Sequence, residues 1–141
     1  MQKKGVTEPR FHWRDVVEIA VGACVMAFPV AVTEEVWNLG EELALGRVLL
    51  FALASLFFLA VFIYVLHDHA GFPSTRKAFL LRVGSTYGMT LLISALLLLG
   101  VDRIDLLQDP LIALKRTILV AFPASFAATV VDSFAGDSNR R

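Results

Sequence analysis

Four long apolar stretches dominate this sequence, at about residues 16–37, 46–67, 79–100 and 111–132. A helix needs roughly 20 mostly apolar residues to cross about 30 Å of hydrocarbon, and each stretch meets this length. Lipid also forces the backbone polar groups of a spanning segment to bond within that segment. The sequence therefore predicts an all-α fold, a four-helix transmembrane bundle formed by one membrane domain over residues 1–141.

The composition supports a membrane location. Hydrophobic residues make up 57% of the chain and charged residues 18%, whereas a typical soluble protein has about 45–50% and about 25%. A soluble domain of 141 residues could not bury this much apolar surface. The formal net charge is zero, so nothing attracts nucleic acid, and the expected partner is the lipid bilayer.

The positions of lysine and arginine predict the orientation. With the N-terminus inside, nine of these cations lie on the inner side and four on the outer side, and the cytoplasmic side of a membrane protein carries the excess. We therefore expect a multi-pass protein of the bacterial inner (plasma) membrane with both termini in the cytoplasm. The outer side is acidic, because it holds Glu34, Glu35, Glu41, Glu42, Asp102, Asp105 and Asp109.

Several short motifs resemble a known family. Pro29 is followed by Thr33-Glu34-Glu35-Val36-Trp37, the second span ends near Ala70-Gly71-Phe72, and the fourth contains Pro123-Ala124-Ser125. In this order they resemble a family of bacterial integral membrane proteins that is catalogued as a domain of unknown function. The similarity covers roughly residues 16–133 and implies the membrane architecture without implying a reaction. Where members of that family have a glycine after the last proline, this chain has Ala127 or Ala128.

Two predicted spans carry hydroxyl side chains four residues apart: Thr86, Thr90 and Ser94 in the third, and Ser125 and Thr129 in the fourth. Residues at this spacing share one face of a helix. They could serve helix–helix packing, which is the commoner use of such hydroxyls. They could also line a hydrated path, because intramembrane polar groups face the interior of a bundle.

Pro29 and Pro123 each lie inside a predicted span, and each ends the tripeptide Ala-Phe-Pro. Proline removes a backbone donor and clashes with the preceding turn. Both residues could produce simple kinks. Since the two spans run in opposite directions, the pair could also mark an inverted repeat with broken helices that coordinate an ion.

The outer end of the first span carries Thr33, Glu34 and Glu35. In an oligomer, a repeated carboxylate forms an acidic ring, which concentrates cations at a channel entrance. Glu35 is the favoured carboxylate, because it matches the family motif. The alternative is that Lys115 and Arg116, at a similar depth, neutralise these glutamates as ion pairs.

At the inner end, Glu18, Arg82 and Asp132 come to a comparable depth and are expected to form a structural bridge. We predict no metal site, because His67-Asp68-His69 lacks further ligands at a recognised spacing. No catalytic motif or cofactor-binding loop is present in the sequence, so we expect neither an enzyme nor a cofactor.

The leading hypothesis from the sequence is therefore a homo-oligomeric cation channel or ion-conducting pathway with an acidic outer entrance. Four helices from a single chain enclose little space for a conduction path. We therefore expect several copies to assemble through faces of small residues. The alternative is a non-transporting membrane scaffold or an accessory subunit of a larger membrane complex.

Overall fold

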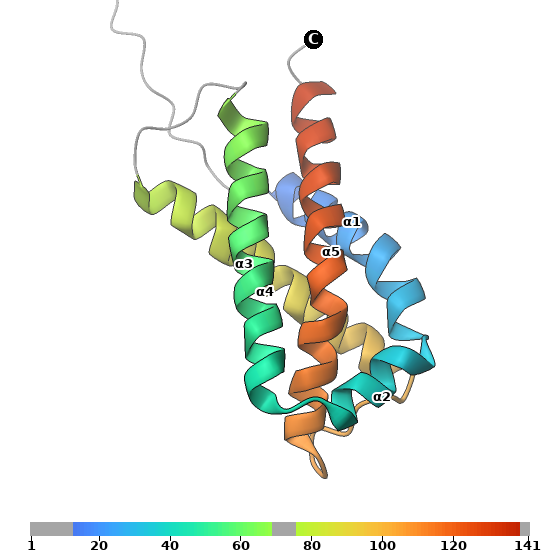
Figure 1. The fold of residues 1–141 in the computed structure, drawn as a ribbon. Helices are drawn as coiled ribbons and strands as arrows, with labels where there is room; N and C mark the ends of the chain where they lie inside the picture. Colours follow the sequence, from blue (N-terminus) through green and yellow to red (C-terminus); the bar gives the residue numbers. More distant parts are fainter. Residues whose placement is uncertain (1–12, 69–75, 139–141) are drawn as a thin grey trace, which may run out of the picture.

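The computed structural model describes residues 13–68 and 76–138. Every element of regular structure in these two ranges is helical: α1 (Trp13–Ala31), α2 (Glu34–Glu42), α3 (Leu45–Asp68), α4 (Arg76–Gly100) and α5 (Pro110–Ser138). The all-α prediction is therefore confirmed. Figure 1 shows four long helices and the short α2, which lies across one end of the molecule.

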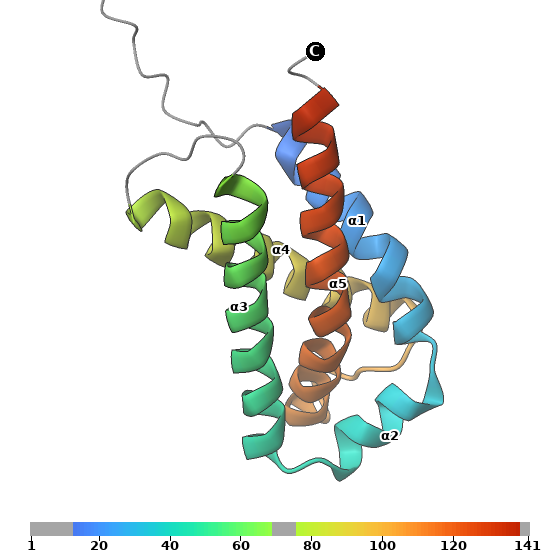
Figure 2. The ribbon, with the colours of Figure 1, turned by 45° about the horizontal axis from the view of Figure 1, so that its top comes forward.

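Helix α5 occupies the centre of the bundle and contacts each of the other four helices. Helices α1 and α4 run in one direction, whereas α3 and α5 run in the other (Figures 1 and 2). The start of α1 and the end of α5 therefore lie at the same end of the bundle. At the opposite end lie α2 and the connection between α4 and α5.

The first predicted span differs from a single helix over residues 16–37. Helix α1 ends at Ala31, and α2 leaves it at an angle of 80° after a two-residue break. The other three predictions lie close to α3, α4 and α5. Three helices are long and apolar enough to cross a membrane, and the number reaches four only if α1 and α2 together count as one span.

The surface of the bundle is apolar, as lipid contact requires. Large hydrophobic side chains are exposed on all five helices, including Val25, Leu50, Phe57, Leu81 and Leu114. Helix α3 is the least buried of the three long apolar helices: 22% of the residues in its apolar segment are buried, against 50% in α5. Helix α3 therefore presents most of its surface to lipid.

Small side chains allow α1 and α5 to approach closely. Ala23 and Ala27 of α1 and Ala124 and Ala128 of α5 are fully buried in one cluster. Gly22 lies so near α5 that a Cβ atom added there would be 2.8 Å from the Ala127 carbonyl oxygen. The small-residue faces that the sequence predicted for close packing are therefore used within the chain, at least between these two helices.

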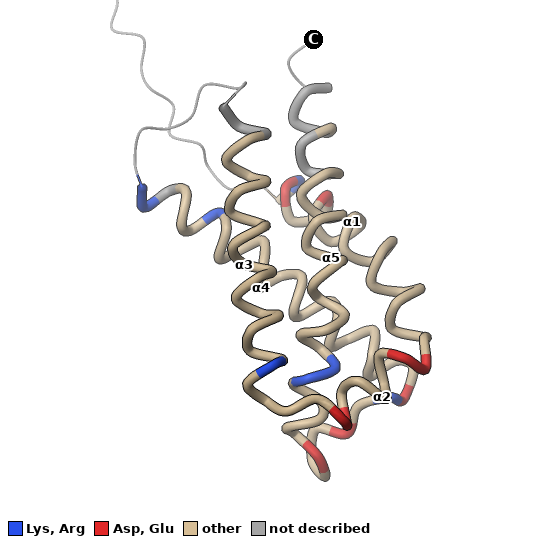
Figure 3. Tube along the Cα trace, in the orientation of Figure 1, with Lys and Arg blue, Asp and Glu red and all other residues tan. Residues whose placement is uncertain are grey.

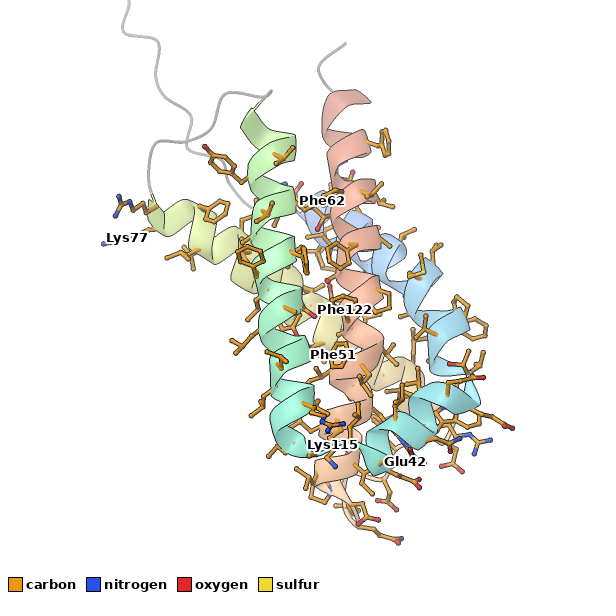
Figure 4. All side chains as sticks on the ribbon, in the orientation of Figure 1. Glu42, Phe51, Phe62, Lys77, Lys115 and Phe122 are labelled. Carbon is orange, nitrogen blue, oxygen red and sulfur yellow. The ribbon has the colours of Figure 1, made fainter. Side chains whose placement is uncertain are left out.

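Helices α3 and α5 pack through phenylalanine rings. Phe51 meets Phe122 edge to face at 6.2 Å between ring centroids. One helical turn or more further along, Phe126 contacts both Phe58 and Phe62, at 6.4 Å and 6.3 Å. These pairs fix the register of the two helices, which run side by side (Figure 4).

The connection between α4 and α5 has well-defined ends. The N–H groups of Asp102 and Arg103 bond to the carbonyls of Leu99 and Leu98, and Asp102 has a φ of 57°. This is a Schellman motif with a non-glycine residue in the left-handed position. Helix α5 begins at Pro110, and the Asp109 carbonyl accepts its first bond, as the Asp-Pro pair predicted.

Candidate functional site

The charged residues divide between the two ends of the bundle. In Figure 3 the acidic residues gather on α2 and on the connection 101–109, which together we call the acidic end. Its seven carboxylates are Glu34, Glu35, Glu41, Glu42, Asp102, Asp105 and Asp109, and all seven residues are exposed. The start of α4, at the other end, carries Arg76, Lys77 and Arg82 (Figure 3).

The bend between α1 and α2 is held by local hydrogen bonds. Thr33 is the N-cap of α2, but its hydroxyl donates backward to the Val30 carbonyl at 2.7 Å. The indole Nε1 of Trp37 donates to the Ala31 carbonyl at 2.8 Å. These two donors satisfy carbonyls that the end of α1 leaves without an intrahelical partner. Thr33 therefore closes a helix end rather than pointing into an open space.

Arg116 of α5 fixes α2 against the bundle. Its Nε and Nη2 atoms donate to the Trp37 carbonyl at 3.3 Å and 3.2 Å, and Nη2 also pairs with the Glu41 carboxylate. Its Nη1 donates to the carbonyl of Arg103. Gly40 packs on the stem of Arg116, where a Cβ atom would collide with the arginine Cγ. One guanidinium thus joins α2, α5 and the α4–α5 connection.

A second arginine adds to this link. The Arg103 guanidinium carbon lies 3.6 Å from the centroid of the Trp37 ring. Stacking of this kind is attractive because the face of the indole ring is electron-rich. Trp37 therefore connects α2 to α1 through its ring nitrogen and to Arg103 through its ring face.

An open cleft of about 400 Å³ lies beside this link. Four carboxylates and two guanidinium groups line it, together with Ile104 and Ile112: Glu41, Asp102, Asp105, Asp109, Arg103 and Arg116. Asp105 accepts hydrogen bonds from the N–H groups of Leu107 and Gln108 at 2.9 Å and 3.1 Å, so its carboxylate shapes the connection. The cleft has an excess of negative charge.

The predicted entrance residues lie at the acidic end but outside the cleft. Glu34 and Glu35 occupy the first turn of α2, where both are exposed, and neither forms an ion pair with a described residue. Among the described residues, Lys115 and Arg116 form one ion pair with a glutamate of α2, which is the pair between Arg116 and Glu41. Carboxylates favour the positive end of the helix dipole, so Glu34 and Glu35 stabilise the start of α2.

The predicted pathway hydroxyls are all buried, at 0–2% exposure: Thr86, Thr90, Ser94, Ser125 and Thr129. Thr90 and Thr129 donate to the carbonyls four residues earlier, at 2.8 Å and 2.9 Å, and Ser125 donates to the Phe122 carbonyl. The Ser94 hydroxyl has no hydrogen-bond partner among the described residues. A donated hydrogen leaves the oxygen lone pairs available, so these side chains can still accept a bond from water or coordinate a cation.

The two Ala-Phe-Pro tripeptides occupy different settings. Pro29 is exposed and lies two residues before the end of α1, close to the bend. Pro123 lies within α5, which continues to Ser138. Only the first tripeptide is followed by a break in the helix.

At the opposite end, Glu18 pairs with Arg14 of its own helix at 3.7 Å. The predicted bridge to Arg82 is not formed by Glu18. The side chain of Asp132 lies outside the described part of the chain, so its pairing with Arg82 stays a prediction. His67, Asp68 and His69 also have side chains outside the described part. Among the side chains that the structure describes, no three of His, Cys, Asp or Glu cluster as a metal site would need.

The apolar surface, the long apolar helices and the charged groups gathered at the ends define an integral membrane protein. The sequence model of one family, described as "Putative integral membrane protein (DUF2391)", matches residues 2–131. The chain belongs to this family. Neither the curated proteins nor the solved structures contain a match to the chain.

Proposed function

We propose that this protein conducts cations across a bacterial inner membrane as a homo-oligomer, with both termini in the cytoplasm and the acidic end outside. The observation that supports this function best is the excess of exposed carboxylate at the acidic end. Arg116 and Arg103 are committed to contacts with Trp37 and Glu41, whereas Glu34 and Glu35 form no ion pair with a described residue. Such a surface raises the local concentration of cations.

The buried hydroxyls supply a route away from this surface. Along α4, Ser94, Thr90 and Thr86 descend from the acidic end in steps of about 6 Å, since four residues of helix rise about 6 Å. Ser125 and Thr129 continue the series on α5, at depths of about 22 Å and 28 Å from the start of that helix. Oxygen ligands at this spacing suit a hydrated cation or a chain of waters.

The contact between copies would use α4. Gly84 and Gly88 are exposed on this helix, and no atom lies within 4 Å of the Cβ position of either. A glycine pair at this spacing allows two membrane helices to approach closely. The hydroxyls of α4 lie about 200° around the helix from these glycines, on the face buried within the chain, so in this arrangement each copy keeps its own route.

The test is cation flux from liposomes that contain the purified protein. Wild-type protein should pass cations, and Glu35→Gln should reduce the rate. Glu42→Gln is the matched control, because it removes the same charge from the other end of α2. Liposomes with wild-type protein that are no leakier than empty ones would refute the function. Equal flux in wild type and Glu35→Gln would refute the role of Glu35.

The orientation is tested separately. Reporter tags inserted after residues 40 and 105 should both report from the periplasmic side, because both positions lie at the acidic end. If both tags reported from the cytoplasm, the proposed orientation would be wrong and the acidic end would lie inside the cell.

A scaffold or accessory subunit is the second candidate. The contact of Gly22 with the backbone of α5 and the bonds of the threonine hydroxyls to their own helices favour it, since both describe tight packing inside the chain. It predicts no flux and a stable protein partner that remains bound after extraction in mild detergent.

A further inference from the structure

The side chain of Lys115 is largely buried along its stem, and its ammonium has no counter-ion among the described residues. It is 8% exposed, and it forms no hydrogen bond or ion pair with a described residue. Its neighbour Arg116 is bound to Glu41 and to two backbone carbonyls. The ammonium nitrogen itself is accessible at the surface, so the stem of Lys115 is buried while its charge is open to an anion from outside.

The register of α3 and α5 places Lys115 at the beginning of α3. Lys115 and Phe122 are seven residues apart, which is about two turns, so they share one face of α5. That face meets α3, because Phe122 contacts Phe51. The two helices run in the same direction, so counting back from the three phenylalanine pairs gives residues 44, 47 and 51 as level with Lys115, which therefore lies beside the first two turns of α3. Figure 4 shows Lys115 on α5 beside the lower end of α3.

The beginning of α3 lacks a cap. The Ala44 carbonyl accepts the N–H groups of Arg47 and Val48 at 2.9 Å and 3.3 Å, so Ala44 is the N-cap residue, and its methyl group cannot accept a bond. The N–H groups of Leu45 and Gly46 bond to no described residue. The space at Gly46 is open, because no atom lies within 4 Å of its Cβ position.

Positive charge therefore accumulates at one place. The helix N-terminus carries a partial positive charge, Lys115 adds a full charge, and Arg47 is exposed on the first turn of α3. The acid nearest in sequence, Glu42, is exposed and forms no ion pair with Lys115. Free N–H groups next to a cation form a typical anion site.

We propose that the N-terminus of α3, together with Lys115 and Arg47, binds a phosphate group. The group is the headgroup phosphate of an anionic phospholipid or free phosphate. The depth suits a headgroup, because Leu45 is the first residue of one candidate span and Lys115 lies five residues after the start of another. The Lys115 stem can then lie along apolar side chains while its ammonium reaches the phosphate.

The experiment compares lipids and phosphate on the purified full-length protein in a neutral detergent. Phosphatidylglycerol should raise the midpoint of thermal unfolding more than phosphatidylcholine does. Lys115→Gln should bind phosphatidylglycerol at least tenfold more weakly in a titration. Lys77→Gln, which removes one exposed charge from the opposite end, should bind as wild type does. Sodium phosphate is compared with sodium chloride at equal ionic strength.

The outcomes distinguish a lipid headgroup from free phosphate as the bound group. Stabilisation by phosphatidylglycerol alone assigns the site to a headgroup, and stabilisation by phosphate beyond chloride assigns it to the free ion. If Lys115→Gln fails to fold, Arg47→Gln is the second variant, with an expected loss of about threefold in affinity. Equal effects of both lipids and both salts would overturn the proposal, as would unchanged binding in a folded Lys115→Gln or Arg47→Gln variant. The measurement does not depend on cation flux.

Discussion

The close approach of α1 to α5 at Gly22 can be tested by adding one methyl group. In Gly22→Ala the new Cβ would lie 2.8 Å from both the Ala127 carbonyl oxygen and the Ala128 Cα atom, and 3.0 Å from the Val131 Cβ. The first two are backbone atoms of α5, which cannot turn aside as the end of a long side chain can. The substitution must therefore move α1 away from α5.

The matched control for this variant is Gly84→Ala. Gly84 also lies inside a helix, but its Cβ position has open space around it. Alanine favours a helix over glycine by about 1 kcal/mol, and this gain is common to both variants. Over-packing a tight contact costs about 1–3 kcal/mol. The free energy of unfolding of Gly22→Ala should therefore be lower than that of Gly84→Ala by about 1–3 kcal/mol.

The assay is reversible unfolding in mixed micelles of dodecyl maltoside and sodium dodecyl sulfate, followed by tryptophan fluorescence. Protein is kept dilute, so that contacts between copies do not contribute to the stability of the control. A Gly22→Ala variant as stable as Gly84→Ala would show that α1 and α5 are further apart than described, and the reasoning would be refuted.

Three further predictions use the same unfolding measurement. Arg116→Gln should lower the free energy of unfolding by about 2–3 kcal/mol, because charged hydrogen bonds to Glu41 and to two carbonyls are lost; no loss would mean that α2 is not held by this side chain. Trp37→Phe should cost about 1 kcal/mol, since it removes the bond to the Ala31 carbonyl and keeps an aromatic ring; a variant of wild-type stability would show that this bond does not hold the bend. Asp102→Gly should raise stability by about 0.5–1 kcal/mol and Asp102→Ala should lower it, because only glycine adopts the left-handed φ of 57° without strain; the opposite order would contradict the Schellman ending of α4.

The sequence predicts most of the helices because hydropathy and end signals are local. The predicted second, third and fourth stretches fall within α3, α4 and α5, and Asp109-Pro110 marks the start of α5. The first stretch was predicted as one helix because its apolar run continues past Pro29. The bend depends on the Thr33 and Trp37 side chains and on Arg116, 79 residues further along the chain than Trp37. Contacts of that range leave no periodic pattern.

The candidate site was only partly predictable for the same reason. Counting charges located the acidic end, but it could not show which acids line the cleft. Glu35 was favoured from a motif, whereas the cleft is lined by Glu41 together with acids of the α4–α5 connection. The adjacent cations Lys115 and Arg116 look equivalent in the sequence. They lie about 100° apart around α5: Arg116 bonds to α2, whereas Lys115 is on the side of α5 that faces α3.

The unequal burial of the helices has a consequence for biogenesis. Of the three long apolar helices, α3 is the most apolar and the least buried, so it should leave the translocon for lipid on its own. Helix α1 carries Arg14, Asp15 and Glu18 and does not qualify as a span without α2. It should therefore stay beside the translocon until α5, the last of the five described helices, arrives and covers the face around Gly22.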